Sequence, residues 1–264
     1  MKILKNQGTF KVVSKSENVI SEIAEFARIC YQSQDKSCEE NDLKLINNLM
    51  TRGHYAMFEF ADIKVIFNGV SRGFTHELVR HRIASYAQES TRYVDEKEFE
   101  YIVPPHRDEN SYDNGIFSFT ECLKTNETAY KEFRRRGWKP EDARQILSTA
   151  LNAQIGMKAS VREWRHVFTM RCDLFAHWEI RAVMINLLKW CQANIPVVFD
   201  DFKFFKTKDG IEYARPVMSA FNLGEKINEY SEHFDLNTLV NKLDDLTSMK
   251  LFQILKEKHF NKEN

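Results

Sequence analysis

The polypeptide has 264 residues, of which 43% are hydrophobic and 29% charged, with only 9 glycines and 5 prolines. This balance excludes a disordered or collagen-like protein and suits one large domain or two small ones. The 38 Lys and Arg residues balance the 38 Asp and Glu residues, so no overall field would recruit nucleic acid or an anionic membrane, and any anion must be bound by a local cluster.

The first third of the chain predicts two helices, a strand and the beginning of a third helix. Apolar residues recur at helical spacing over residues 19–30, and a second helix is expected over 42–52, where Gly53 ends it. Residues 62–67 alternate apolar and polar side chains, as a half-buried strand does. From residue 70 to 78 the spacing of apolar residues is helical again.

The middle of the chain predicts a short strand followed by helices. The strand is expected over residues 99–103, immediately before two prolines. A helix is then expected over residues 114–136, because Gly137 is typical of the residue that follows a helix. Pro140 and its acidic neighbours indicate the first turn of another helix.

The last part of the chain is mainly helical in pattern. A capping box at residues 160–163 predicts a helix that reaches about residue 171, and a longer helix is expected over 180–196. Residues 208–210, Lys-Asp-Gly, predict a hairpin turn between two short strands. We therefore expect one α+β domain over residues 1–220 and a charged helical C-terminal extension over 221–264.

The densest polar stretch of the sequence lies between Arg80 and Tyr93 and contains three arginines, a histidine, a glutamine, two serines and two tyrosines. A guanidinium offers five N–H donors in a rigid fork that suits phosphate. Arg80 and Arg82 flank His81 and would point to different sides of a helix, which suits two anionic ligands better than one. The alternative to a ligand-binding segment is a basic segment exposed to solvent, but the small and aromatic residues here favour a ligand-binding surface.

Arg80-His81-Arg82 is followed, after seven residues, by Ser90 and then by Arg92-Tyr93. This spacing resembles the signature of the flavin-dependent thymidylate synthases, the family that makes dTMP from dUMP with FAD. Further segments are similar to that family in the same order, namely Gly53-His54 with Phe58-Glu59, residues 143–147, residues 160–166 with 170–171, and residues 176–181. The resemblance implies a central, mostly antiparallel sheet flanked by helices.

The resemblance implies a set of residues around dUMP: Arg80, Gln88, Ser90, Thr91, Arg92, Arg144 and Arg171. It assigns the phosphate to Arg92 and Arg144 and the carbonyl edge of the uracil to Arg171. A fixed cation at that edge would stabilise the enolate-like charge that develops when the ring is activated. By the same resemblance, Arg171, Ser90 and His54 are the expected catalytic residues.

The resemblance also implies contacts to FAD from His54, Glu59, Arg80, His81, Arg82, Ile83, Arg162 and His166. Arg82 and Arg162 would bind the diphosphate, and His54 would lie close to the ring, where folate arrives. Five positions depart from the family. Asparagines are common at Ser160 and His166, a glutamine at Glu77, a histidine at Phe60 and a proline at Ser148. None of the five cysteines lies in the signature, which fits a route in which the flavin carries the redox step.

The expected activity is the reductive methylation of dUMP to dTMP, in which methylenetetrahydrofolate donates the carbon, NADPH reduces FAD, and the reduced flavin supplies the hydride. The family's homotetramer, with its pocket between subunits, is expected here too. The alternative is a non-catalytic nucleotide-binding or RNA-binding protein that uses the same arginines together with aromatic stacking. The zero net charge and the lack of a recognisable RNA-binding motif speak against that alternative.

Other classes of site have weaker support in the sequence. His76 and His81 are five residues apart, the wrong spacing for two ligands on one helical face, so no metal site is expected. Ser90 lacks the GxSxG context of a hydrolase. The apolar run at 182–188 is too short for a membrane span, and residues 1–6 lack the apolar stretch of a signal peptide. A cytoplasmic protein without a membrane or nucleic-acid partner is therefore expected.

Overall fold

A four-stranded antiparallel sheet lies at the centre of the chain in the computed structural model, which describes residues 1–6, 8–93, 98–112 and 115–217. Its strands lie in the order β2 (Thr9–Lys15), β3 (Asp62–Ser71), β6 (Asn152–Ser160) and β4 (Ala84–Gln88). This arrangement confirms the expected α+β fold with a central, mostly antiparallel sheet. The domain boundary expected at residue 220 and the helical extension expected over 221–264 lie outside the described residues.

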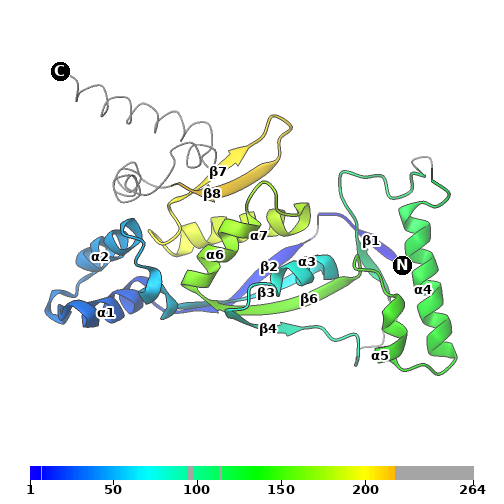
Figure 1. Ribbon diagram of the computed structural model, residues 1–264, viewed down its shortest axis with the longest axis horizontal. Coiled ribbons are helices and arrows are strands. Elements are labelled where there is room, and N and C mark those ends of the chain that lie inside the picture. The colour runs from blue at the N-terminus through cyan, green and yellow to red at the C-terminus, as the bar shows by residue number, and fades with distance from the viewer. Residues whose placement is uncertain (7, 94–97, 113–114, 218–264) are drawn as a thin grey trace, which may run out of the picture. The chain divides into compact units, whose positions relative to one another are not determined.

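Helices flank this sheet and cover one of its faces (Figure 1). Strand alternation turns Ile63, Val65 and Phe67 of β3 towards the helices, together with Ile155 and Met157 of β6, and all five side chains are buried. The helices over the sheet and at its end are α3 (Arg72–Leu78), α6 (Val161–Arg171), α7 (Trp178–Asn194), α1 (Val19–Tyr31), α2 (Glu39–Thr51) and the 3₁₀ helix η2 (Tyr55–Glu59).

Local signals set most helix limits near the predicted positions. Asn18 caps α1, because its side-chain oxygen accepts a backbone N–H at 3.1 Å. Gly53 and Gly137 have φ values of 71° and 85°, a conformation that favours glycine, and they follow the ends of α2 and of α4 (Phe119–Arg135). Helix α4 begins later than predicted, because Ser118 and Glu121 form a reciprocal capping box there.

Two elements of the sheet differ from the sequence prediction. The prediction of a helix from Val70 was wrong, because β3 continues to Ser71 and α3 begins at Arg72. Val70 is buried on the inner side of the strand, after a bulge that includes Gly69 with φ 65°. Strand β6 was not predicted, although its residues alternate between buried and exposed, because Asn, Gly, Lys and Ala favour strands weakly.

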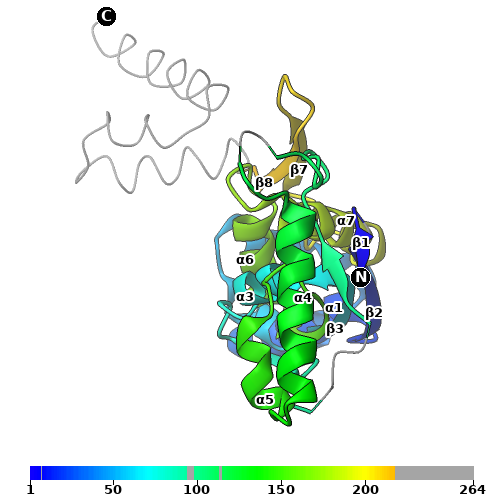
Figure 2. The same cartoon turned by 90° about the vertical axis from the view of Figure 1, so that its right-hand side faces the viewer.

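A second apolar cluster forms beside the central sheet, around the parallel pair of β1 (Lys2–Leu4) and β5 (Glu100–Ile102). Helix α4 and the short α5 (Pro140–Ala143) lie side by side there, as Figure 2 shows. The cluster buries Phe99, Tyr101, Leu123, Tyr130 and Leu151. These elements confirm the predicted strand near residue 100, the predicted helix that stops before residue 137, and the predicted start at residue 140.

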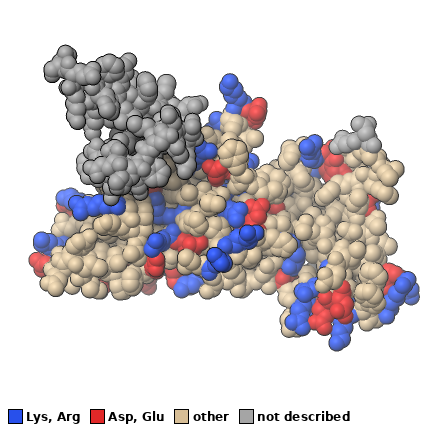
Figure 3. All heavy atoms as spheres, viewed as in Figure 1, with Lys and Arg blue, Asp and Glu red and all other residues tan. Residues whose placement is uncertain are grey.

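The predicted hairpin is formed by β7 (Phe202–Lys206) and β8 (Glu212–Pro216), and Gly210 in its turn has a φ of 81°. Two further short helices are η1 (Gln34–Lys36) and η3 (Arg144–Ile146). Basic and acidic side chains are interspersed over the face of the molecule seen in Figure 3. Among the helices in the described ranges, none is both long enough and apolar enough to span a bilayer.

A buried ion pair between α1 and α2 yields a stability prediction. Arg28 Nη2 and Nε donate to Asp42 Oδ1 at 2.6 and 3.2 Å, and each side chain is only 5% exposed. Replacing Asp42 by Ala leaves the guanidinium buried without its counter-charge, so the free energy of unfolding should fall by about 3–5 kcal/mol. Chemical denaturation followed by circular dichroism measures this loss.

The matched control is Glu40→Ala on the same helix, which removes an exposed ion pair with Lys44 at 2.6 Å. Solvent screens that pair, so its loss should be much smaller than the loss for Asp42→Ala. Equal losses in the two variants would contradict the assigned role of burial.

Candidate active site

The signature residues form a loop, strand β4 and a turn along one edge of the central sheet. Ala84 pairs with Ala159, and Gln88 pairs with Ile155. Because β6 continues directly into α6, this register places Arg82, just before β4, beside the start of α6. Residues 90–93 follow the other end of the strand, which spans roughly 13 Å. The expected site residues are therefore distributed along an edge strand and its two ends.

Arg171 at the end of α6 is held by Glu77, in the last turn of α3, and by His81, in the loop between α3 and β4. Its Nε donates to His81 Nε2 at 3.0 Å, and its Nη1 donates to Glu77 Oε2 at 2.8 Å. Its Nη2 donates to the backbone oxygen of Glu77 at 2.9 Å. These contacts fix the guanidinium plane and tie α6 to α3, so Arg171 presents a positive charge in a set orientation.

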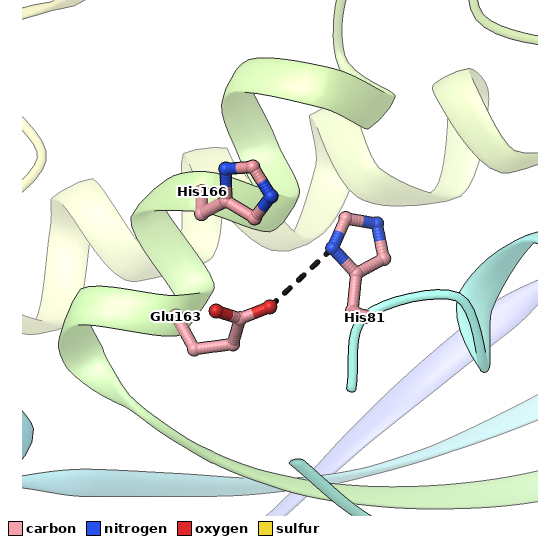
Figure 4. A group of neighbouring side chains, drawn as sticks. All are labelled: His81, Glu163 and His166. Carbon is pink, nitrogen blue, oxygen red and sulfur yellow. Dashed lines mark ion pairs between the residues drawn. The ribbon is translucent and has the colours of Figure 1, made fainter. Parts of the chain in front are cut away.

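His81 is buried between two charged side chains of α6, Arg171 and Glu163, and Figure 4 shows it facing Glu163. Since its Nε2 accepts a hydrogen bond from Arg171, the neutral ring must carry its proton on Nδ1, which faces Glu163 Oε1 at 3.4 Å. Burial, followed by the positive charge of Arg171 and by His166, lowers the pKa of His81 to about 4. Burial also raises the pKa of the Glu163 carboxyl. His81 is therefore neutral near pH 7.

His81, Glu163 and His166 offer three possible metal-ligand atoms within 4.8 Å of one another, although the two histidines lie far apart in the sequence (Figure 4). The sequence analysis considered only the spacing of His76 and His81 and did not predict this group. The Nε2 atom of His81 already accepts from Arg171, whose positive charge would oppose a cation beside it. The geometry therefore favours a hydrogen-bonded support for Arg171 over a metal centre.

The residues expected around FAD gather near the start of α6. Arg162 Nη1 lies 2.6 Å from Glu59 Oε1, both side chains are about half exposed, and His54 directly precedes η2. The other exposed residues that were expected to contact FAD lie on the loop before β4, namely Arg80, Arg82 and Ile83, and on α6, namely His166. Exposed guanidinium groups at one corner of a sheet match the negative charge of a diphosphate, so this donor set fits FAD.

The residues expected around the nucleotide phosphate gather beyond the other end of β4. Arg92 Nε and Nη2 lie 2.9 and 2.8 Å from Glu141 Oε2, which α5 supplies. Arg144 Nη1 donates to Thr91 Oγ1 at 3.5 Å, and Ser90 Oγ accepts the backbone N–H of Arg92 at 3.2 Å. The fold thus brings two arginines and two hydroxyl groups together, and a phosphate would compete with Glu141 for Arg92.

Side chains of β4 join the strand to α3 between these two ends. Gln88 Nε2 donates to Thr75 Oγ1 at 2.9 Å. The Tyr86 hydroxyl lies 2.8 and 2.7 Å from the backbone oxygens of Leu78 and His81, and burial raises the pKa of Tyr86 to about 12. Tyr86 therefore acts as a neutral donor that holds the loop before β4.

Three side chains that shape the site were not predicted as site residues: Glu77, Glu163 and Tyr86. Glu77 stands out in the sequence only as a departure from the family. Glu163 was predicted to belong to a capping box, and Ser160 Oγ does accept its backbone N–H at 3.3 Å. Its carboxylate, however, faces His81. A glutamate three residues after a serine is typical of capping, so the sequence carries no signal for this second role.

The buried position of His81 predicts its titration. Its folded-state pKa of about 4 lies below its ordinary value of 6.5, so the neutral ring contributes stability that is complete above pH 6.5 and is lost as the pH falls towards 4. Nitrogen NMR at pH 6 should show a neutral ring with its proton on Nδ1. In Arg171→Ala the pKa of His81 should rise, because a nearby positive charge is removed; an unchanged pKa would contradict the assigned pair.

The fold is similar to that of a solved structure of PolB, a UMP/dUMP methylase from Streptomyces cacaoi bound with 5-Br dUMP. The similarity has a TM-score of 0.64 and covers 76% of this chain and 96% of that chain. The two sequences are 19% identical, so this likeness concerns the fold.

Sequence relatives are closer than this structural neighbour. Flavin-dependent thymidylate synthases from Mycobacterium bovis, Mycobacterium tuberculosis and Mycobacterium marinum are 33% identical over 208 residues, which cover 73% of this chain and 83% of each relative. The family model described as "Thymidylate synthase complementing protein" matches residues 11–197. Since that match includes all but the first two residues of the central sheet, together with α6, α7 and the whole signature, the chain belongs to the family of flavin-dependent thymidylate synthases.

Proposed function

We propose that this protein converts dUMP to dTMP by reductive methylation, with a flavin as the redox cofactor. The arrangement of charged groups along β4 carries the proposal. Arg92 and Arg144 lie beyond one end of the strand, and Arg171 contacts the loop at its other end. A nucleotide lying along the strand would have its phosphate and its base bound by different arginines.

The arginines of the two ends would perform different tasks. Arg92 and Arg144, with the hydroxyl groups of Ser90 and Thr91, would bind the phosphate by charge-assisted hydrogen bonds. Arg171 would face the carbonyl edge of the uracil, where it stabilises the negative charge that develops as C5 becomes nucleophilic. Because Arg171 is already held by other side chains, little reorganisation is needed when that charge appears.

The corner at the start of α6 would bind FAD, which after reduction would supply the hydride that completes the methyl group. Arg82 and Arg162 would bind the diphosphate, and the exposed Arg80 and Ile83 would contribute further contacts. His54 would lie near the flavin ring, at the position where folate enters. NADPH as the reductant and methylenetetrahydrofolate as the carbon donor complete the proposed reaction.

We also propose that the site is completed within a homotetramer. Ile83 and Tyr93, which flank β4, are 75% and 79% exposed. A neighbouring subunit that packed along this edge of the sheet would cover both side chains. The cytoplasmic location expected from the sequence stays a prediction.

The reaction itself is tested by measuring dTMP formed from dUMP with FAD, NADPH and methylenetetrahydrofolate. Arg171→Ala should lower the rate at least about 100-fold, as the loss of a preorganised charge does in other enzymes. Ser90→Ala should weaken dUMP binding about fivefold and leave flavin reduction by NADPH unchanged, because it removes one hydrogen bond at the phosphate end. Unchanged dUMP affinity in Ser90→Ala would contradict this placement.

The same assay separates the two candidate functions. A wild-type protein that binds dUMP, takes up no FAD and forms no dTMP would support the non-catalytic nucleotide-binding alternative.

The cofactor assignment is tested by FAD titration followed by flavin fluorescence. Arg82→Ala should weaken FAD binding at least about tenfold, because it removes a charge-assisted contact to the diphosphate. Arg136→Ala, which removes an exposed arginine that directly follows α4 and pairs with Glu132, is the matched control and should retain full affinity. Full flavin occupancy in Arg82→Ala would show that the diphosphate is bound elsewhere.

A further inference from the structure

Glu77 at the end of α3 binds the guanidinium of Arg171 with two of its oxygens. The carboxylate oxygen Oε2 accepts from Nη1 at 2.8 Å, and the backbone oxygen accepts from Nη2 at 2.9 Å. The other carboxylate oxygen lies 4.0 Å from His177 Nδ1. Glu77 therefore contacts both terminal nitrogens of the guanidinium from one side.

The N–H groups of Arg171 that Glu77 does not bind indicate the role of the contact between Glu77 and Arg171. A guanidinium has five N–H groups, and the Nε–H group of Arg171 donates to His81. In the described part of the chain, three of the five are thus used by Glu77 and His81, and one N–H remains on each terminal nitrogen. The Arg171 side chain is 17% exposed, so it is not fully enclosed by the protein.

We propose that Glu77 is a positioning residue, which fixes the rotation of the Arg171 guanidinium so that its two remaining N–H groups face the pyrimidine carbonyl edge. This inference rests on the proposed function. Three acceptors around one planar group define the plane, whereas His81 alone would leave rotation about the Nε hydrogen bond possible. Preorganisation of this kind lowers the cost of ordering at the moment of reaction.

The carboxylate of Glu77 can be tested apart from its backbone oxygen. Glu77→Ala removes the acceptor for Nη1, so kcat for dTMP formation should fall about 10- to 100-fold, the range for a hydrogen bond to a charged group. KM for dUMP should change less than about threefold, because the phosphate contacts remain. Glu77→Gln keeps an oxygen acceptor at the same place and should restore kcat to within about threefold of wild type.

A second measurement reports on the guanidinium without turnover. In the wild type and in Glu77→Gln, hindered rotation of the Arg171 side chain should give separate Nη resonances in nitrogen NMR. In Glu77→Ala these signals should merge. Arg171→Ala identifies the resonances by removing them.

The matched control is Asp173→Ala. Asp173 Oδ2 lies 2.9 Å from Arg215 Nε, and the two side chains are 26% and 33% exposed, so this pair has the same chemistry and a similar exposure. Its loss should leave kcat and the Arg171 resonances unchanged. Melting temperature and FAD content should be equal in both Glu77 variants and the wild type.

Each outcome decides the proposal. The positioning role would be overturned if kcat in Glu77→Ala stayed within twofold of wild type. It would also be overturned if kcat fell equally in both Glu77 variants and their FAD content was lower. Either result would leave the proposed function standing. A wild-type protein that forms no dTMP under the full set of substrates would overturn both. Separate Nη resonances in Glu77→Ala would mean that other groups hold the guanidinium. That result would also contradict the proposal.

Discussion

The arrangement of the site depends on one buried, neutral histidine. His81 is 5% exposed and lies between Glu163 and the guanidinium of Arg171. A protonated ring would place two positive charges side by side away from water, and burial opposes the charged form further. Because the ring is neutral, its Nε2 atom can accept from Arg171, and this contact joins α6 to the loop before β4. The Nε contact of Arg171 thus depends on the protonation state of a neighbour.

Local pairing of opposite charges explains how a chain with zero net charge can present several anion-binding arginines. Arg92 pairs with Glu141, Arg162 pairs with Glu59, and Arg171 pairs with Glu77. The first two pairs are substantially exposed, so solvent already weakens them and a phosphate or diphosphate can replace the carboxylate at small cost. The third pair is less exposed and has a further acceptor in His81, which suits a charge that must stay in place.

The order of strands in the central sheet converts separate segments into one site. Strand β6 lies between β3 and β4, and it continues directly into α6. This placement brings the loop before β4 to the first turn of α6, where the expected flavin residues gather. The far end of β4 reaches α5 and η3, which supply Glu141 and Arg144. Within the described residues β4 is an edge strand, so no further strand pairs with its outer side.

The sequence by itself determined the helices with local caps, the strand from Asp62, the hairpin and the ligand-binding signature, because capping, alternation and turn chemistry depend on neighbouring residues. It did not determine β6, whose residues favour strands weakly and which is stabilised by pairing with β3 and β4. The strand assignment of Val70 also depended on pairing, here with Ala153. Only the tertiary structure decided that Glu77 binds Arg171, 94 residues away, and that Glu163 faces His81. Such contacts depend on which backbones the fold brings together, and no local preference encodes them.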